Sequence, residues 1–300
     1  MDNSTPSFRH PTVQAWFDRG EICAINGNDI FVIDEGSEND STIVLIHGFP
    51  TSSYDFLPMF DALGQNHRIV CIDMLGFGFS DKPNKRDYTL HKQADLFDAL
   101  LKERNINEYH VFAHDYGVSV AQELLARQID GSAFGDWLSC CFLNGGLFPE
   151  THKALLIQKI MLSSLGRIVN KLAGIKQFSA SFSKVFGRDT KPTERELAEF
   201  WEIINYKDGR HLFHNLITYI LDRRQYRARW VEALQQSPVP LALINGSVDP
   251  VSGKHLVERY KELNCRLDYL KELPTIGHYP HVESPLEVQK AYLQFLKQVQ

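Results

Sequence analysis

Short apolar runs rich in β-branched residues alternate with segments of helical periodicity along most of the chain. Because the runs are apolar on both faces, they are typical of strands buried in a parallel sheet between two helical layers. The expected strands span residues 30–36, 41–48, 67–74, 108–115, 138–146, 239–249 and 267–274. The expected helices between and after them span residues 90–104, 118–128, 253–262 and 284–300. The sequence therefore predicts an α/β fold with a doubly wound sheet.

One segment interrupts this alternation. From 147 to 231 the strand signal disappears and only helical patterns remain, such as "TERELAEFWEII". We expect a helical cap over the carboxyl edge of the sheet, where open α/β sheets bind their ligands. The predicted domains are an α/β core made of 1–146 and 232–300 and a cap made of 147–231. The alternative is a helical bulge with only a packing role.

Composition and charge exclude several classes of function. The chain has 300 residues, 43% of them hydrophobic, and a formal net charge of -5. A protein that binds nucleic acid normally presents a basic face to the phosphates, so no nucleic-acid partner is expected. The stretch "RRQYRARW" (223–230) is locally basic, and we interpret it as the solvated side of a helix.

Segments that would direct the chain to a membrane or to secretion are not evident. The first residues lack the apolar stretch of a secretory signal, and no later stretch reaches the roughly 18 apolar residues of a membrane helix. The five cysteines form no CxxC pair, which indicates reduced thiols and a cytoplasmic protein. We found no metal-ligand spacing or phosphate-binding loop, so neither a metal nor an organic cofactor is expected.

The most specific motif is "VFAHDYGVSV" (111–120), a strand that enters a glycine-bearing turn and then a helix. This is the pattern of a nucleophile elbow, with Asp115 where an esterase has serine. Gly117 lets the helix approach the strand closely. The alternative for Asp115 is an ordinary helix cap.

Further polar groups follow other expected strands. "LIHGFP" (45–50) places the Phe49 N–H where, with the N–H of Tyr116, it can face a developing oxyanion. Asp249 follows the strand that returns from the cap, and His278 follows the last strand. We therefore predict Asp115 as nucleophile, Asp249 as supporting acid and His278 as base. His281 is a competitor for the base.

Several motifs together resemble those of a known family. They are "HGFPTSSYDF", "LGFGFSDKP", "HDYGVSVAQELL", "NGGLFPETHKALLIQK", "RARWVEAL" and "GHYPHVESP". In these motifs, and in the order nucleophile, acid, histidine, the chain resembles the α/β-hydrolase fold family, specifically its epoxide hydrolase and haloalkane dehalogenase branch. The resemblance implies a mostly parallel eight-stranded sheet with helices on both faces, a helical cap, an aspartate nucleophile and a small, apolar organic substrate.

A carboxylate nucleophile indicates reaction at saturated carbon. Serine suits a carbonyl carbon, whereas an alkyl ether formed on serine could not be hydrolysed. Asp115 can displace a leaving group from an sp³ carbon and form an ester. Water activated by His278 can then hydrolyse that ester while Asp249 orients the imidazole.

The leaving group separates the alternatives. Epoxide opening needs a proton donor, and Tyr219 has a spacing similar to that of a cap tyrosine in epoxide hydrolases; His152 or Tyr206 is a candidate for the second donor. Haloalkane dehalogenases usually have Trp after the nucleophile, where this chain has Tyr116. Fluoroacetate dehalogenases carry arginines there, whereas this chain has Tyr116 and Ser119. A non-catalytic binding protein of the same fold and an esterase are the remaining alternatives.

Overall fold

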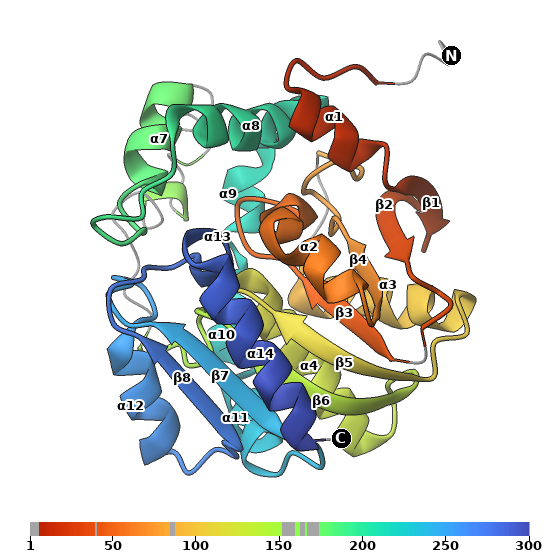
Figure 1. Cartoon of the computed structure of the whole chain (residues 1–300), viewed down its shortest axis with the longest axis vertical. Coiled ribbons are helices and arrows are strands. Elements are labelled where there is room, and N and C mark those ends of the chain that lie inside the picture. Colours follow the sequence, from red (N-terminus) through yellow and green to blue (C-terminus); the bar gives the residue numbers. More distant parts are fainter. Residues whose placement is uncertain are drawn as a thin grey trace.

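The computed structural model describes residues 6–39, 41–84, 88–151, 160–162, 166 and 174–299. Its centre is an eight-stranded sheet in the order β1-β2-β4-β3-β5-β6-β7-β8 (Figure 1). The strands are β1 Glu21–Ile25, β2 Asn28–Glu35, β3 Thr42–Ile46, β4 Arg68–Ile72, β5 Glu108–Ala113, β6 Asp136–Phe142, β7 Leu241–Gly246 and β8 Tyr269–Leu273. β2 pairs antiparallel with β1 and β4, and all other neighbours pair parallel. The predicted α/β fold with a mostly parallel eight-stranded sheet is confirmed.

One strand has no counterpart among the runs expected from the sequence. β1 forms a hairpin with β2 through Asn26 and Gly27, both of which have positive φ angles (49° and 74°). This backbone favours Asn-Gly, and the dipeptide is itself a hairpin signal. β1 was missed because it is a short edge strand with a largely exposed burial pattern, so it lacks an apolar run.

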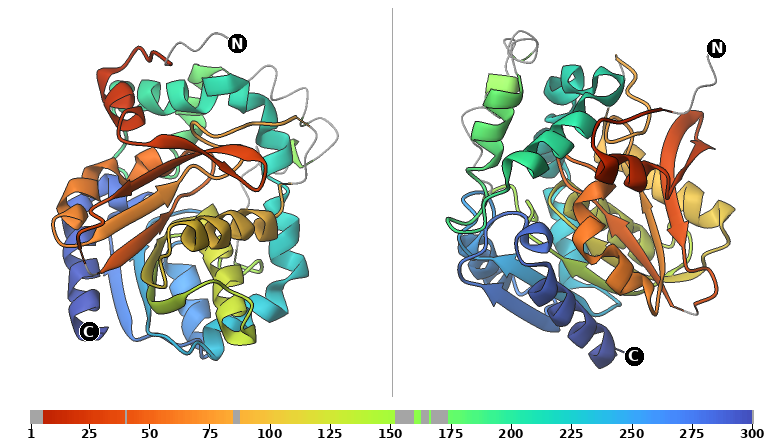
Figure 2. Two further views of the ribbon diagram at one scale, coloured as in Figure 1. Left: turned by 90° about the vertical axis from the view of Figure 1, so that its right-hand side faces the viewer. Right: turned by 45° about the horizontal axis from the view of Figure 1, so that its top comes forward.

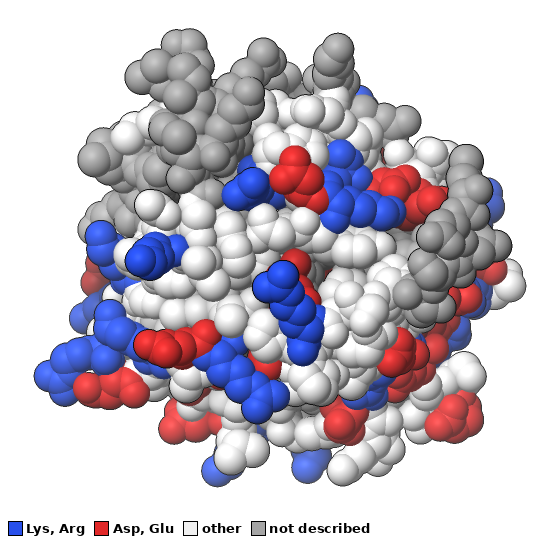
Figure 3. Space-filling view, turned by 90° about the horizontal axis from the view of Figure 1, so that it is seen from above, with Lys and Arg blue, Asp and Glu red and all other residues white. Residues whose placement is uncertain are grey.

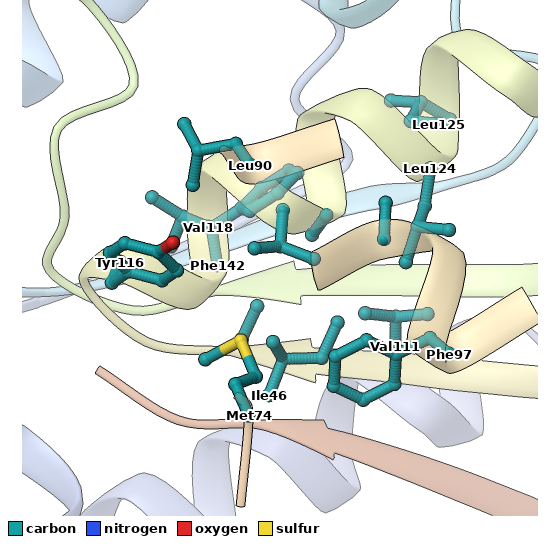
Figure 4. Packing of buried hydrophobic residues seen from close by; sticks show 14 of the residues in the cluster. Ile46, Met74, Leu90, Phe97, Val111, Tyr116, Val118, Leu124, Leu125 and Phe142 are labelled. Carbon is teal, nitrogen blue, oxygen red and sulfur yellow. The ribbon is translucent and has the colours of Figure 1, made fainter. Parts of the chain in front are cut away.

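Helices cover both faces of the sheet. They are α1 Pro11–Phe17, α2 Leu57–Gly64, α3 Leu90–Glu103, α4 Tyr116–Asp130, α12 Lys254–Glu262, α13 Pro280–Glu283 and α14 Pro285–Val299, with the 3₁₀ helix η1 at Ser53–Phe56. Successive residues of β3 point to opposite faces, and all of them are buried. One face packs against α1, α2 and α14, and the other against α3, α4 and α12. Figure 4 shows side chains of α3 and α4, Phe97 and Leu124 among them, packed over Ile46 and Val111 of the sheet.

Between β6 and β7 the described residues form helices. These are α7 Ile175–Phe182, α8 Glu194–Asn205, η2 Tyr206–Leu212, α9 Phe213–Leu216, α10 Tyr219–Gln225 and α11 Arg227–Gln235. Figures 1 and 2 show α7, α8 and α9 gathered at one end of the molecule, beyond the sheet. Aromatic contacts join α7 and α8 to the core. The ring centroids of Phe182 and Tyr279 are 5.0 Å apart, and those of Phe200 and Tyr54 are 5.9 Å apart. The predicted core–cap boundary at 231/232 falls within α11.

The surface in Figure 3 carries basic and acidic side chains interspersed with wide uncharged areas. Of the predicted basic stretch 223–230, Arg223 and Trp230 are each only 1% exposed. That prediction was wrong for these two residues, because α10 and α11 pack this side of the stretch against the core. Within the described residues, no helix combines the length and the apolar character that crossing a membrane requires. All five cysteines are free thiols, four of them buried.

Candidate active site

Asp115 lies at the turn between β5 and α4 with φ 44° and ψ -104°, a conformation that is unusual for a residue with a Cβ. The turn brings α4 close to β3, and this requires glycine at position 117. A Cβ there would lie 2.4 Å from the carbonyl oxygen of Ile46. The Asp115 side chain makes no capping hydrogen bond to α4. The helix-cap alternative therefore does not account for this residue, and its carboxylate is free to face the loops that follow other strands.

Those loops bring the three predicted triad residues together. Nε2 of His278 lies 3.6 Å from Oδ1 of Asp115, and Nδ1 of His278 lies 2.7 Å from Oδ2 of Asp249. All three side chains are buried, with at most 5% of each residue exposed. Nδ1 of His278 donates its proton to Oδ2 of Asp249. The other ring nitrogen, Nε2, therefore faces Asp115. This is the arrangement of a nucleophile, a base and an orienting acid.

The pKa values follow from this geometry. Burial acts to lower the pKa of His278, but the carboxylates of Asp249 and Asp115 outweigh it and raise the pKa to about 10. Burial acts to raise the pKa of Asp115, yet His278 and the charge of Arg223 hold it well below its usual range. Asp249 has a lowered pKa for the same reason, because the charge of His278 outweighs burial. These directions favour an imidazolium between two carboxylates in the resting site.

Asn144, which follows β6, contacts both Asp115 and Asp249, and sequence reasoning missed it. Its Nδ2 donates to Oδ2 of Asp249 (2.9 Å), and its backbone carbonyl accepts from the N–H of Asp115 (2.8 Å). The Asp249 carboxylate also accepts from the backbone N–H groups of Val251 (2.7 Å) and Ser252 (3.0 Å). Asn144 thus connects the nucleophile turn to the acid. Its position directly after a strand in "LNGG" was the available signal.

Of the two predicted oxyanion donors, Phe49 contacts the Asp115 carboxylate and Tyr116 follows Asp115 in the chain. The N–H of Phe49 donates to Oδ2 of Asp115 (3.1 Å), and the Phe49 carbonyl accepts from the hydroxyl of Tyr279 (3.1 Å). Tyr116 is the first residue of α4, where N–H groups lack intrahelical partners. Oδ2 is thus the oxygen directed at a donor, while Oδ1 faces His278.

Tyr219 lies in the same site, with its ring 5.0 Å from that of Tyr116 and 5.9 Å from that of Phe49. Arg223, four residues later on α10, lies beside it with its guanidinium carbon 4.4 Å from the Tyr219 ring centroid. Nε of Arg223 donates to Oγ of Ser119 (2.7 Å), and Nη2 donates to the backbone carbonyl of Asp115 (3.0 Å). Sequence reasoning missed Arg223; residues four apart share a helix face, so its spacing from Tyr219 was the available signal.

The other candidates fall elsewhere. His152 lies outside the described residues. Tyr206 packs against Phe8 and Phe79, at ring distances of 5.6 Å in each case. His281 is fully buried behind the site, whereas Nδ1 of His278 holds the contact with the acid. Ser119 lies inside α4 with its hydroxyl bonded to Arg223, so it does not occupy the elbow that an esterase serine requires.

Comparisons with known proteins agree with this fold. A family model described as "Alpha/beta hydrolase family" matches residues 43–291. The mesoderm-specific transcript protein of Mus musculus is 37% identical over 295 residues, which cover 95% of this chain and 88% of that protein. The putative hydrolase LipZ of Mycobacterium tuberculosis is 34% identical over 286 residues, covering 95% and 98%. The crystal structure of a haloalkane dehalogenase from Bradyrhizobium elkani superposes with a TM-score of 0.77 at 19% identity, covering 93% of this chain and 98% of that chain.

Proposed function

The chain belongs to the alpha/beta hydrolase family, and we propose that it hydrolyses a small, apolar epoxide through an ester formed on Asp115. The observation that carries the proposal is the identity of the residue at the elbow. The elbow residue is a carboxylate, not a hydroxyl, and its Oδ1 lies 3.6 Å from Nε2 of His278. Its Oδ2 accepts a hydrogen bond from the backbone N–H of Phe49. This set suits displacement at saturated carbon followed by hydrolysis of an ester.

In the first step Oδ1 of Asp115 attacks a ring carbon of the epoxide, and the bond from that carbon to the epoxide oxygen breaks. The electron pair stays on the oxygen, which takes a proton from the hydroxyl of Tyr219. Burial, reinforced by the charge of Asp115, raises the pKa of Tyr219, so the phenol carries its proton at neutral pH. The products of this step are a hydroxyalkyl ester on Asp115 and a tyrosinate.

Ester formation also changes the protonation of His278. It neutralises Asp115, one of the two carboxylates that raise the pKa of the imidazole. The imidazolium proton can then return to the Tyr219 tyrosinate, which leaves His278 neutral and able to act as a base. Asp249 keeps its hydrogen bond with Nδ1 of His278, and this keeps Nε2 directed at the ester.

In the second step His278 takes a proton from water, and the resulting hydroxide attacks the carbonyl carbon of the ester. The negative charge develops on Oδ2, which already accepts from the N–H of Phe49. One such donor is typically worth about 3 kcal/mol of transition-state stabilisation. Collapse of the intermediate releases a diol and restores the Asp115 carboxylate. The described part of the proposed cap supplies Tyr219.

A dehalogenase is the second candidate, and Arg223 favours one form of it. The Arg223 guanidinium is buried beside the nucleophile, and its Nη1 has no hydrogen-bond partner among the described residues. A carboxylate on the substrate could pair with this group, as in a haloacid. The sequence alone assigned no arginine to the site, which was the argument against this substrate class.

The test combines a substrate screen with trapping of the intermediate. Purified protein is offered epoxides, haloalkanes and haloacids, and the products are identified. A His278→Gln variant is then mixed with each productive substrate and measured by intact-protein mass. We expect an adduct that accumulates and maps to Asp115, because the variant forms the ester but hydrolyses it slowly. His255→Gln, which removes a histidine on α12, should show no adduct. A turned-over substrate that leaves no adduct on His278→Gln would contradict the proposal.

A further inference from the structure

Three buried side chains converge behind the candidate active site. Asp55 comes from η1, His114 follows β5, and His281 comes from α13. Their potential ligand atoms all lie within 4.8 Å of one another, and each residue is at most 1% exposed. The three segments are far apart in sequence, so the fold itself builds this cluster.

Four polar atoms of the cluster have no hydrogen-bond partner among the described residues. They are Oδ1 of Asp55, Nδ1 of His114 and both ring nitrogens of His281. Buried polar atoms in native proteins almost always have partners. Three neighbouring residues that each carry such an atom therefore indicate a group bound between them.

The remaining polar atoms orient the cluster. Nε2 of His114 lies 2.8 Å from the backbone carbonyl of His278, and since a carbonyl only accepts, Nε2 carries the proton. Nδ1 of His114 then carries an unprotonated lone pair, and it has no hydrogen-bond partner among the described residues. The Thr51 hydroxyl likewise donates to Oδ2 of Asp55, which leaves Oδ1 available. Such outer hydrogen bonds to a carbonyl and to a ligating carboxylate are the usual support of metal ligands.

We propose that Asp55, His114 and His281 bind one divalent transition-metal ion, with Zn²⁺ as the fitting example. Two imidazole nitrogens and one carboxylate oxygen form a ligand set that Zn²⁺ accepts. A single water molecule is the competing occupant, and the measurements below distinguish it from an ion.

The position of the cluster gives the ion a structural role. His114 immediately precedes Asp115, and His281 follows His278 by three residues. Asp55 belongs to the segment that continues from Phe49. One ion would therefore fasten together the chain segments that carry the nucleophile, the base and the oxyanion donor. Neither step of the ester mechanism passes through the ion, so failure of the metal proposal would leave that mechanism intact.

The first test is metal content. Protein produced with added Zn²⁺ and freed of loose metal by gel filtration should contain about one zinc ion per chain by plasma mass spectrometry. His281→Gln and Asp55→Asn should each lose most of this zinc while keeping the circular dichroism of the wild type. His255→Gln removes a histidine outside the cluster and should retain it. Equal zinc in His281→Gln and wild type would overturn the proposal, since the ion would then lie elsewhere.

A second measurement keeps the test decisive if the variants do not fold. Wild-type protein is unfolded with a chelator and refolded with or without Co²⁺ or Zn²⁺. Bound Co²⁺ should give visible absorption bands, and Zn²⁺ should raise the Tm because it binds only the folded state. Wild-type protein that refolds without metal uptake and with an unchanged Tm would show that the cluster holds water only.

Discussion

Nη2 of Arg223 lies 3.9 Å from Oδ1 of Asp115, and both side chains are buried. The arginine comes from α10 and the aspartate from the turn after β5, so the contact joins the proposed cap to the sheet. A guanidinium at this distance stabilises the carboxylate form of Asp115.

Replacing Arg223 should shift the acid limb of the pH–rate profile. Burial raises the pKa of Asp115, and Arg223 is one of the groups that counteract it. In Arg223→Met we expect kcat/KM to begin its fall at a higher pH than in wild type. Arg224→Met, which alters an exposed neighbour, should leave the profile unchanged. Coincident profiles for Arg223→Met and wild type would contradict this account of the charge.

Tyr219→Phe should separate epoxide from halide chemistry. A departing alkoxide needs a proton, whereas a halide leaves without one. We therefore expect epoxide turnover to fall roughly 10²-fold or more while any haloalkane turnover is retained. Tyr226→Phe, at the end of the same helix, is the matched control. Unchanged epoxide turnover in Tyr219→Phe would show that another group donates the proton.

Asp249→Asn should lower activity strongly with little change in the fold. The amide can no longer accept the Nδ1–H of His278 as a carboxylate does, so the ring loses its orientation and its stabilised cationic form. A loss of roughly 10³- to 10⁴-fold in kcat is expected. Asp268→Asn, which alters a partly exposed pair with Arg266, should keep wild-type activity. Near-normal kcat in Asp249→Asn would exclude Asp249 as the orienting acid.

The raised pKa of His278 predicts how stability depends on pH. The folded-state pKa of about 10 exceeds the ordinary value of 6.5, so the native state holds this proton more tightly than the unfolded chain does. The stabilisation is therefore complete below pH 6.5 and is lost as the pH rises toward 10. The free energy of unfolding, measured in urea at several pH values, should fall over this range more steeply in wild type than in His278→Gln. If the unfolding free energies of wild type and His278→Gln changed in parallel with pH, the raised pKa of His278 would be contradicted.

Gly117→Ala should destabilise the turn. The added Cβ would lie 2.4 Å from the backbone carbonyl of Ile46, so either α4 or β3 must shift. We expect a loss of about 1–3 kcal/mol in unfolding free energy, which is the usual cost of overpacking. Activity should fall further than stability, because Asp115 moves with the turn. Gly64→Ala meets its nearest neighbour, Ile69 Cγ1, at 3.9 Å and should be close to neutral in urea unfolding.

The sheet could be predicted because its central strands are apolar on both faces. The edge strand β1 escaped this criterion, since an exposed edge carries no continuous apolar run. The Asn-Gly pair at 26–27 marked its hairpin nevertheless. That turn signal was the one available in the sequence for β1, and it was not used.

The proximity of Asp115, Asp249 and His278 could be predicted because each lies in a loop that follows a strand, and parallel strands end at one edge. Residues that act through the tertiary fold were not accessible in this way. The sequence alone indicates that Arg223 is a surface cation, because only the packing of α10 in the folded protein buries it. The convergence of Asp55, His114 and His281 likewise depends on three loops whose proximity no spacing reveals.

The origin of the oxygen added to the product tests the central claim most directly. A single turnover is run in H₂¹⁸O with protein in excess over a productive epoxide, and both the diol and the peptide containing Asp115 are analysed by mass spectrometry. The account predicts that the diol of this first turnover carries only ¹⁶O and that ¹⁸O enters the Asp115 carboxylate. A diol labelled with ¹⁸O beside an unlabelled Asp115 would contradict it, because water would then have attacked the substrate directly.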